Sequence, residues 1–255
     1  MENGDSIFMP KKNKGQKIGI LGFGEVGQAI AKFYKNPLIK DLERNTNLAG
    51  VDVLHICIPW SDNFFDIAEK EIQKSKPGLV IIHSTVAPGT TKKLADKLNG
   101  MVVHSPIRGV HPNLYEGIKI FVKYIGAEND KASKTAEKHF KNLGIKTKTF
   151  FPSVTTELGK ILDTTYYGVV IAWHGEMKEI CDQFGVDFEK SVTDFNETYN
   201  EGYAKLGKKN VIRPVFYPPQ FGKPKHCIVP NASILDKYFK SPFFEPLLKK
   251  YKDKL

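Results

Sequence analysis

Residues 17–28 of the chain read KIGILGFGEVGQ, and this stretch decides the fold. An apolar run at 18–21 leads into a glycine-rich turn at 22–27, and a helix-like segment follows at 29–34. A strand, a G-x-G-x-x-G turn and a helix in this order are typical of a dinucleotide-binding unit. The alternative is a glycine-rich turn that serves packing alone.

The glycines of this turn have separate tasks. Gly22 permits the tight bend, Gly24 lets the backbone approach a pyrophosphate, and Gly27 lets the helix pack closely on the strand. Asp41 closes the next short apolar segment, roughly 20 residues further on, where an acid binds the ribose hydroxyls of NAD. The predicted cofactor-binding residues are Gly22, Phe23, Gly24, Glu25, Val26, Gly27, Asp41, Pro59, Ser84 and Thr85.

Composition is that of an ordinary globular protein of 255 residues, with 41% hydrophobic and 26% charged residues. No apolar run reaches the roughly 18 residues that a membrane span needs. Residues 1–15 are polar and predict a disordered tail. Three widely separated cysteines argue against a disulfide framework or a zinc cluster and favour a reducing, cytoplasmic location. The net charge of +10 favours acidic ligands, although the lysines are spread along the chain.

Strand-like and helix-like segments alternate as far as residue 150. This alternation predicts a doubly wound parallel sheet, in which ligands bind beyond the carboxyl ends of the strands. Gly22, Pro59, Ser84 and His104 all fall at such ends. After the first unit, strands are expected at 51–58, 78–83, 101–104, 124–127 and 145–150, and helices at 62–74, 90–98 and 131–143.

The rhythm changes near residue 152. Residues 153–184 carry one long helical pattern that stops at Gly185, and more helix is expected at 188–206. A loop rich in proline, glycine and aromatic residues follows at 213–230, before a short helical end. We therefore predict a Rossmann domain at 16–152 and a smaller all-helical substrate and dimerisation domain at 153–255.

Two groups of polar residues are candidates for substrate contacts. One helical face carries Lys160, Thr164, Tyr167 and His174, and Lys160 would act there on a substrate hydroxyl. Otherwise this face meets solvent, and Lys160 is paired with Glu157 or Asp163. His104, Arg108 and His111 follow a strand, and otherwise belong to loop structure alone. His55 and His83 stand within apolar strands and are expected to be core histidines. Cys57 and Cys181 are expected to pack in the strand and helix that carry them.

Four stretches together resemble the UDP-glucose/GDP-mannose dehydrogenase family, within the 6-phosphogluconate dehydrogenase-like group. They are GFGEVG at 22–27, STVAPGTT at 84–91, ELGK at 157–160 and GKPKHCIVPN at 222–231. The resemblance implies that Thr85 lies near the nicotinamide, that Lys160 is the catalytic lysine, and that Cys227 is the family's nucleophilic cysteine. It also implies a homodimer through the helical domain. The alternative is that Cys227 is a small buried side chain in a packed loop.

The chain departs from this family at three acidic or amide positions. Thr164 replaces an asparagine, Asn231 replaces an aspartate, and Ile107 replaces the glutamate of the family's S/C-P-E-R motif. The family's third domain is also absent from the sequence. Oxidation of an alcohol to an acid needs a base that activates water for thioester hydrolysis. With both acids replaced, a single hydride transfer is expected instead.

The sequence thus predicts a cytoplasmic, NAD-dependent oxidoreductase acting on an anionic or sugar-derived, possibly nucleotide-linked, substrate. Lys40 and Arg44 beside Asp41 keep NADP as an alternative cofactor. A nucleotide-binding sensor or scaffold without turnover is the rival function, and nucleic-acid binding is a weaker third. No metal and no membrane are expected. The predicted catalytic residues are Lys160, Cys227 and Thr164, and the predicted substrate-binding residues are His104, Arg108, His111, Tyr167 and Asn231.

Overall fold

The computed structural model describes residues 15–109, 112–216 and 228–252. Contacts within the chain divide it into two compact units, Met1–Lys160 and Ile161–Leu255. Residues 1–14 of the predicted tail at 1–15 lie outside the described ranges. None of the helices in the described ranges is both long enough and apolar enough to cross a membrane.

The first unit is built on a twisted sheet. In the described residues its strand order is β3-β2-β1-β4-β5-β6-β7-β8. Strands β2, β1, β4, β5 and β6 are parallel, whereas β3 and β7 run antiparallel to their neighbours β2 and β6. The bounds are β1 (Ile18–Leu21), β2 (Leu38–Asp41), β3 (Arg44–Asn45), β4 (Val53–Ile56), β5 (Leu79–Ile82), β6 (Val102–His104), β7 (Lys123–Ala127) and β8 (Thr147–Phe150).

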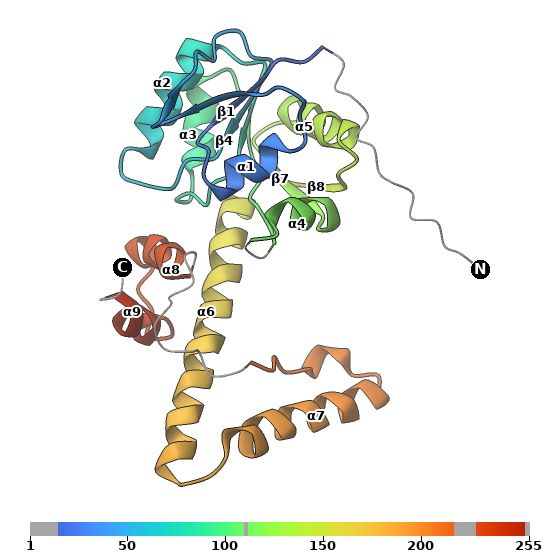
Figure 1. Cartoon of the computed structure of the whole chain (residues 1–255), viewed down its shortest axis with the longest axis vertical. Coiled ribbons are helices and arrows are strands. Elements are labelled where there is room, and N and C mark those ends of the chain that lie inside the picture. Colours follow the sequence, from blue (N-terminus) through green and yellow to red (C-terminus); the bar gives the residue numbers. More distant parts are fainter. Residues whose placement is uncertain (1–14, 110–111, 217–227, 253–255) are drawn as a thin grey trace, which may run out of the picture. The chain divides into compact units, whose positions relative to one another are not determined.

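Helices cover both faces of this sheet, as Figure 1 shows. One apolar core joins the sheet to α1 (Glu25–Ala31), α4 (Leu114–Ile120) and α5 (Asp130–Asn142). The other joins it to α2 (Phe64–Ser75) and α3 (Thr90–Lys97). Four-residue strands such as β4 and β5 are buried throughout because both of their faces are covered. The predicted α/β class with a doubly wound sheet is confirmed.

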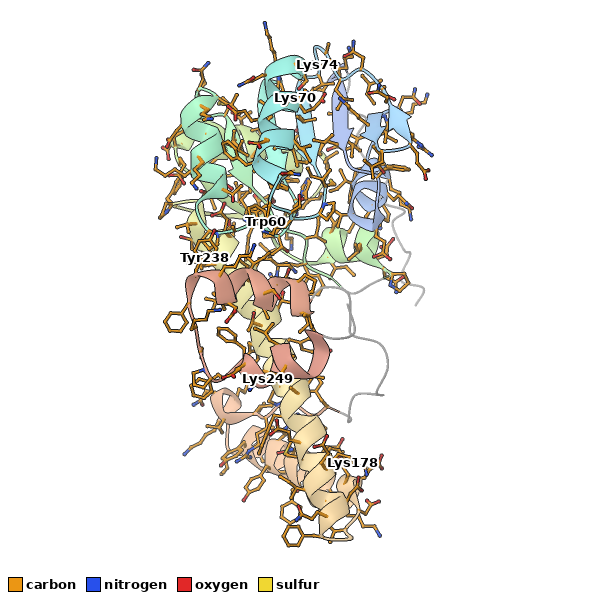
Figure 2. All side chains as sticks on the ribbon, turned by 90° about the vertical axis from the view of Figure 1, so that its left-hand side faces the viewer. Trp60, Lys70, Lys74, Lys178, Tyr238 and Lys249 are labelled. Carbon is orange, nitrogen blue, oxygen red and sulfur yellow. The ribbon has the colours of Figure 1, made fainter. Side chains whose placement is uncertain are left out.

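Helix α2 shows how the pattern of side chains sets these layers. Phe64, Ala68 and Ile72 recur at helical spacing and are buried against the sheet. Lys70 and Lys74 lie on the opposite, exposed side of the same helix (Figure 2). Sequence periodicity alone therefore determines which side of α2 meets the core.

The second unit is all-helical in its described residues. Helix α6 (Val154–Gln183) begins in the first unit and continues into the second. A π-helical turn (Glu189–Thr193), α7 (Asp194–Lys205), a 3-10 turn (Lys209–Val211), α8 (Ile228–Tyr238) and α9 (Glu245–Lys252) follow. Helices α8 and α9 lie close to α6 at Gly168, where an added Cβ would stand 2.4 Å from Ile228 Cγ2 and 2.9 Å from Leu247 Cδ2.

Three features differ from the sequence expectation. Helix α1 begins at Glu25, immediately after the glycine turn, rather than at residue 29. Helix α4 was not expected, because its seven residues follow a proline- and glycine-rich loop. Strand β7 returns antiparallel to β6 after this helix, so β7 begins at the edge of the sheet where β6 ends.

Candidate cofactor and active site

The glycine turn lies at the point where the sheet's strand order reverses. Strand β1 pairs with β2 on one side and with β4 on the other, so its carboxyl end opens between the two crossovers. The Gly22 N–H donates to the Lys40 carbonyl at 2.8 Å, and the Phe23 N–H donates to Asp41 Oδ2 at 3.1 Å. The structure thus brings the predicted acid at the end of β2 directly against the glycine turn.

Geometry separates the three glycines of the turn. Gly22 has φ +93°, and a Cβ there would lie 2.8 Å from backbone atoms of Cys57 and Ile58. A Cβ on Gly27 would lie 2.0 Å from the Gly22 carbonyl oxygen. Gly24 differs: its φ is −65°, and nothing lies within 4 Å of a Cβ built on it. The open space at Gly24 fits the close approach of a pyrophosphate that this motif serves.

The neighbouring loops are held together by backbone acceptors. Ser84 Oγ donates to the Ile58 carbonyl at 2.5 Å, which ties the loop after β5 to the loop after β4. Pro59 is exposed, and Ser84 and Thr85 are half-buried. These predicted cofactor residues surround the same carboxyl edge of the sheet as the glycine turn.

His104 holds the loop after β5 rather than facing outward. Its side chain is fully buried, Nε2 donates to the Ser84 carbonyl at 3.1 Å, and Nδ1 accepts from Thr156 Oγ1 at 2.8 Å. Burial lowers the pKa of His104 to about 3, so the ring is neutral at physiological pH. Both ring nitrogens are hydrogen-bonded to protein atoms, so His104 joins the loop after β5 to α6, and its predicted substrate contact stays a prediction.

Glu157 connects α6 to the loop at 84–91. Its Oε2 accepts from the Gly89 N–H at 2.6 Å, and its Oε1 accepts from the Thr91 N–H at 2.8 Å and from Thr91 Oγ1 at 2.6 Å. Gly89 is the N-cap of α3 and has no side chain of its own, so a carboxylate from another helix satisfies these amides. Burial raises the pKa of Glu157, and the hydrogen bonds from Thr91 and Gly89 oppose that rise.

Lys160 lies one turn after Glu157 on α6 and is half-buried. Burial is the main cause that lowers the pKa of His104 and of Lys123, and the nearby positive charge of Lys160 lowers both further. Arg108 is half-buried, and its guanidinium carbon Cζ lies 4.6 Å from the centroid of the Tyr124 ring. Ile107 is buried in the apolar core, so the position of the family glutamate holds a packed hydrocarbon side chain.

The remaining predicted residues divide into two groups. In the second unit, Thr164 and Tyr167 are half-buried, and the Tyr167 ring packs against Phe216. Asn231 is buried, and its Nδ2 has no hydrogen-bond partner. Cys227 and His111 lie outside the described residues. Their predicted roles therefore stay predictions.

Sequence reasoning missed the two tethers of α6. Thr156 was not singled out, and Glu157 was considered only as part of the ELGK stretch or as a partner of Lys160. The signal for Glu157 is the uncapped start of α3, because a helix that begins at a glycine leaves its first amides to be satisfied from elsewhere. Among the described residues, no group of three or more His, Cys, Asp or Glu side chains is arranged to hold a metal ion.

Fold and site together define a Rossmann-type dinucleotide-binding protein with an added helical unit. No family model matches the chain. Among curated proteins, a UDP-N-acetyl-D-mannosamine dehydrogenase from Methanococcus maripaludis (strain C7) is 30% identical over 206 residues, or 74% of this chain and 45% of the relative. A protein of the same name from Pyrococcus horikoshii is 29% identical over 188 residues, or 66% of this chain and 45% of the relative.

Solved structures agree with the fold. A UDP-D-ManNAc dehydrogenase from Pyrococcus horikoshii superimposes with a TM-score of 0.71 at 20% identity, covering 92% of this chain and 67% of that one. A 3-hydroxyisobutyrate dehydrogenase from Mycobacterium tuberculosis gives a TM-score of 0.65 at 12% identity, covering 94% and 93%. The chain belongs to the UDP-glucose/GDP-mannose dehydrogenase family. It spans about half the length (45%) of the curated relatives that it matches.

Proposed function

We propose that the protein is an NAD-dependent dehydrogenase that oxidises an alcohol carbon of a nucleotide-linked sugar. The observation that carries this proposal is the glycine turn, with its open Gly24 and with Asp41 at its edge. The curated relatives are named UDP-N-acetyl-D-mannosamine dehydrogenases, which supports the substrate class. When bound, NAD would supply the hydride acceptor.

NAD is favoured over NADP by the neighbours of Asp41. A carboxylate there suits a free ribose 2′-hydroxyl and repels a 2′-phosphate. Lys40, one of the two cations that left NADP open, forms an ion pair with the buried Glu71 at 2.5 Å. Arg44 stacks over the Phe23 ring at 4.6 Å. Both cations are therefore engaged by the protein itself.

Lys160 is the proposed acid–base residue. Two side chains in the preceding turn, Thr156 and Glu157, hold this part of α6 against the end of β6 and the start of α3. Such a placement would let Lys160 take the proton of a substrate hydroxyl as the carbon is oxidised. Cys227 and Thr164 are proposed as its partners on the resemblance to the family.

The buried Ile107 supports oxidation by one hydride transfer. At this position a glutamate would serve the later hydrolytic step, whereas a hydrocarbon side chain cannot activate water. Asn231 likewise offers no carboxylate. The proposed product is therefore the carbonyl compound rather than the acid.

The stoichiometry of turnover tests this function. Purified protein is incubated with NAD⁺ and a panel of UDP-linked hexoses and N-acetylhexosamines, and NADH and product are both quantified. We expect one NADH per molecule of carbonyl product, trapped as its hydrazone. Two NADH per molecule, with a uronic acid as product, would overturn the single-transfer proposal. No turnover with any nucleotide sugar would overturn the substrate class.

A homodimer is proposed through α6. Exposed apolar residues recur along α6 and just beyond its end at spacings of four and seven, which places them on one face of the helix: Leu162, Tyr166, Trp173, Ile180 and, one residue after the helix, Phe184. A second copy would cover this face as one helix packs on another. Sedimentation is expected to give a dimer for the parent and a monomer for Trp173→Glu; a monomeric parent would contradict the proposal.

A further inference from the structure

A line of polar side chains crosses the apolar core between the sheet and helices α1 and α5. The Nζ atom of the lysine lies 3.3 Å from the first ring, and successive links then measure 2.9, 2.9 and 2.8 Å. Three of its members are 0%, 2% and 3% exposed, for His55, His83 and Lys123 respectively. We call this line the buried polar chain; in order it comprises Lys123, His83, His55, Tyr34 and His139.

Burial disfavours the charged form of every group in the buried polar chain. Burial lowers the pKa of Lys123 and of His55 and His83 well below their ordinary values, and lowers that of His139 to about 4. Burial also raises the pKa of Tyr34.

The other titratable groups that face the buried polar chain come from the adjoining strands and helices. Cys57, after β4, faces Lys123 and Tyr34, and burial raises its thiol pKa to about 12. His104, from β6, acts on His83, and Lys160, from α6, acts on Lys123. The named neighbours other than Lys160 are themselves buried and, at neutral pH, uncharged.

Fixed carbonyl acceptors determine one order of protons along the chain. Lys123 Nζ donates to the Ser105 carbonyl at 2.6 Å and to the Pro106 carbonyl at 2.8 Å, which uses both N–H bonds of a neutral amine. His83 Nδ1 lies 2.8 Å from the same Ser105 oxygen, so it carries a proton there. A neutral His83 then accepts at Nε2 from His55 Nδ1.

The same reasoning continues to the far end. His55 Nε2 must accept, so the Tyr34 hydroxyl donates to it and in turn accepts from His139 Nε2. His139 Nδ1 is left as a bare acceptor. That atom is buried and has no hydrogen-bond partner. In each of the other hydrogen bonds of the buried polar chain, one atom donates and its neighbour accepts.

A charged Lys123 permits the opposite order. Its third N–H bond would point at His83 Nδ1. His83 would then carry its proton on Nε2 and lose its own hydrogen bond to the Ser105 carbonyl, which Lys123 keeps, and every later link would reverse. His139 would then be protonated on Nδ1. The two orders differ by one proton, and in both of them all three histidines are neutral.

We propose that the buried polar chain is a proton relay between His139 Nδ1 and Lys123 Nζ. A solvent proton, admitted by local opening, bonds to His139 Nδ1 as the Nε2 proton passes to Tyr34. The hydroxyl proton passes to His55 Nε2, the His55 Nδ1 proton to His83 Nε2, and the His83 Nδ1 proton to Lys123. One bond to hydrogen forms for each that breaks.

The position of Lys123 gives the relay a use. As the first residue of the antiparallel β7, it lies at the edge where the parallel strands end and where the glycine turn and Ser84 lie. Oxidation of an alcohol releases a proton at this edge. This use rests on the proposed function, whereas the relay itself does not.

Nitrogen NMR of the full chain, labelled with ¹⁵N-histidine, tests the relay without any substrate. Ring ¹⁵N shifts distinguish the two neutral tautomers. As pH rises across the folded range, we expect His83 and His55 to change from Nε2–H to Nδ1–H and His139 from Nδ1–H to Nε2–H, all with one midpoint. Fixed tautomers, separate midpoints, or imidazolium formation at His55 or His83 would overturn the proposal.

Two variants locate the links. In Tyr34→Phe the hydroxyl is missing, so His55 and His83 should still change together while His139 loses the shared midpoint. A shared midpoint that survives in this variant would contradict the relay. In Lys123→Met no change of tautomer should occur at His55 or His83, and a change there would also contradict it. If Lys123→Met does not fold, the parent and Tyr34→Phe decide the question.

Discussion

At the scale of the residue, Lys160 depends on its neighbours in sequence. Thr156 and Glu157 are buried and hydrogen-bonded to the sheet's loops, whereas Lys160, a turn later, is half-buried. Buried anchors restrict the positions that a following side chain on the same helix can take. The tether therefore brings a cation to the edge of the sheet without immobilising it in the core.

We predict that Lys160→Ala lowers turnover by at least about 100-fold, the scale of lost acid–base catalysis. Steady-state kinetics measure it, with NAD⁺ affinity measured separately by calorimetry and expected to be unchanged. Lys178→Ala is the matched control, because Lys178 lies further along the same helix (Figure 2) and forms an ion pair with the exposed Asp182. Equal turnover in the two variants would remove Lys160 from the mechanism.

At the scale of the element, α3 depends on a cap from another helix. The Gly89 and Thr91 amides at its N-terminus are satisfied by the Glu157 carboxylate, and the Gly89 cap has no side chain that could do so. The same carboxylate fixes the loop at 84–91, so one side chain connects two helices and a predicted cofactor loop. Removing it would affect all three at once.

Glu157→Ala is expected to destabilise the protein, by about 1–3 kcal/mol for each buried donor left unpaired. Chemical denaturation measures the loss, and amide hydrogen exchange at Thr91 should quicken. Lys92→Ala is the control on α3, because its ion pair with Asp96 is exposed and therefore contributes little to stability. A cost no larger than that of the control would show that Glu157 is not the cap.

Sequence reasoning captured what is local and missed what is distant. The alternation of strands and helices predicted the sheet, because period and turn chemistry are read over a few residues. His55 and His83 were correctly expected in the core, since each stands in an apolar strand. The hydrogen bonds that link these histidines to each other, to Tyr34 and to Lys123 could not be predicted, because the partners come from separate elements. The capping role of Glu157 was not predicted for the same reason, because its partners lie 66 and 68 residues away in the sequence.

At the scale of the whole molecule, buried neutral histidines set the response to acid. The folded pKa values of His104 and His139, about 3 and about 4, lie below the ordinary value near 6.5. Between these limits the unfolded chain binds protons that the folded chain does not. Their contribution to stability is therefore complete above about pH 6.5 and is lost as pH falls through the folded values.

We predict that the free energy of unfolding decreases below pH 6.5 by about 1.4 kcal/mol per pH unit for each such histidine. Glu157 opposes this in part, because its raised pKa adds stability at low pH. Urea titrations at pH 7, 6 and 5 measure the slope. His139→Gln keeps a hydrogen-bond donor for Tyr34 and should reduce the slope by about the contribution of one histidine. A slope that is flat in the parent would contradict the burial of these rings in the neutral form.

Calorimetric titration of the parent and Gly24→Ala with NAD⁺, NADH, NADP⁺ and NADPH tests whether the glycine turn binds NAD. Because Gly24 has an ordinary φ and open space around it, alanine should leave the unfolding free energy within about 0.5 kcal/mol. Gly202→Ala, also in open space but on α7, is the matched control. We predict that NAD⁺ and NADH bind the parent and the control at micromolar concentration and bind Gly24→Ala at least about tenfold more weakly. Failure of all four nucleotides to bind the parent, or equal binding to Gly24→Ala, would contradict the account.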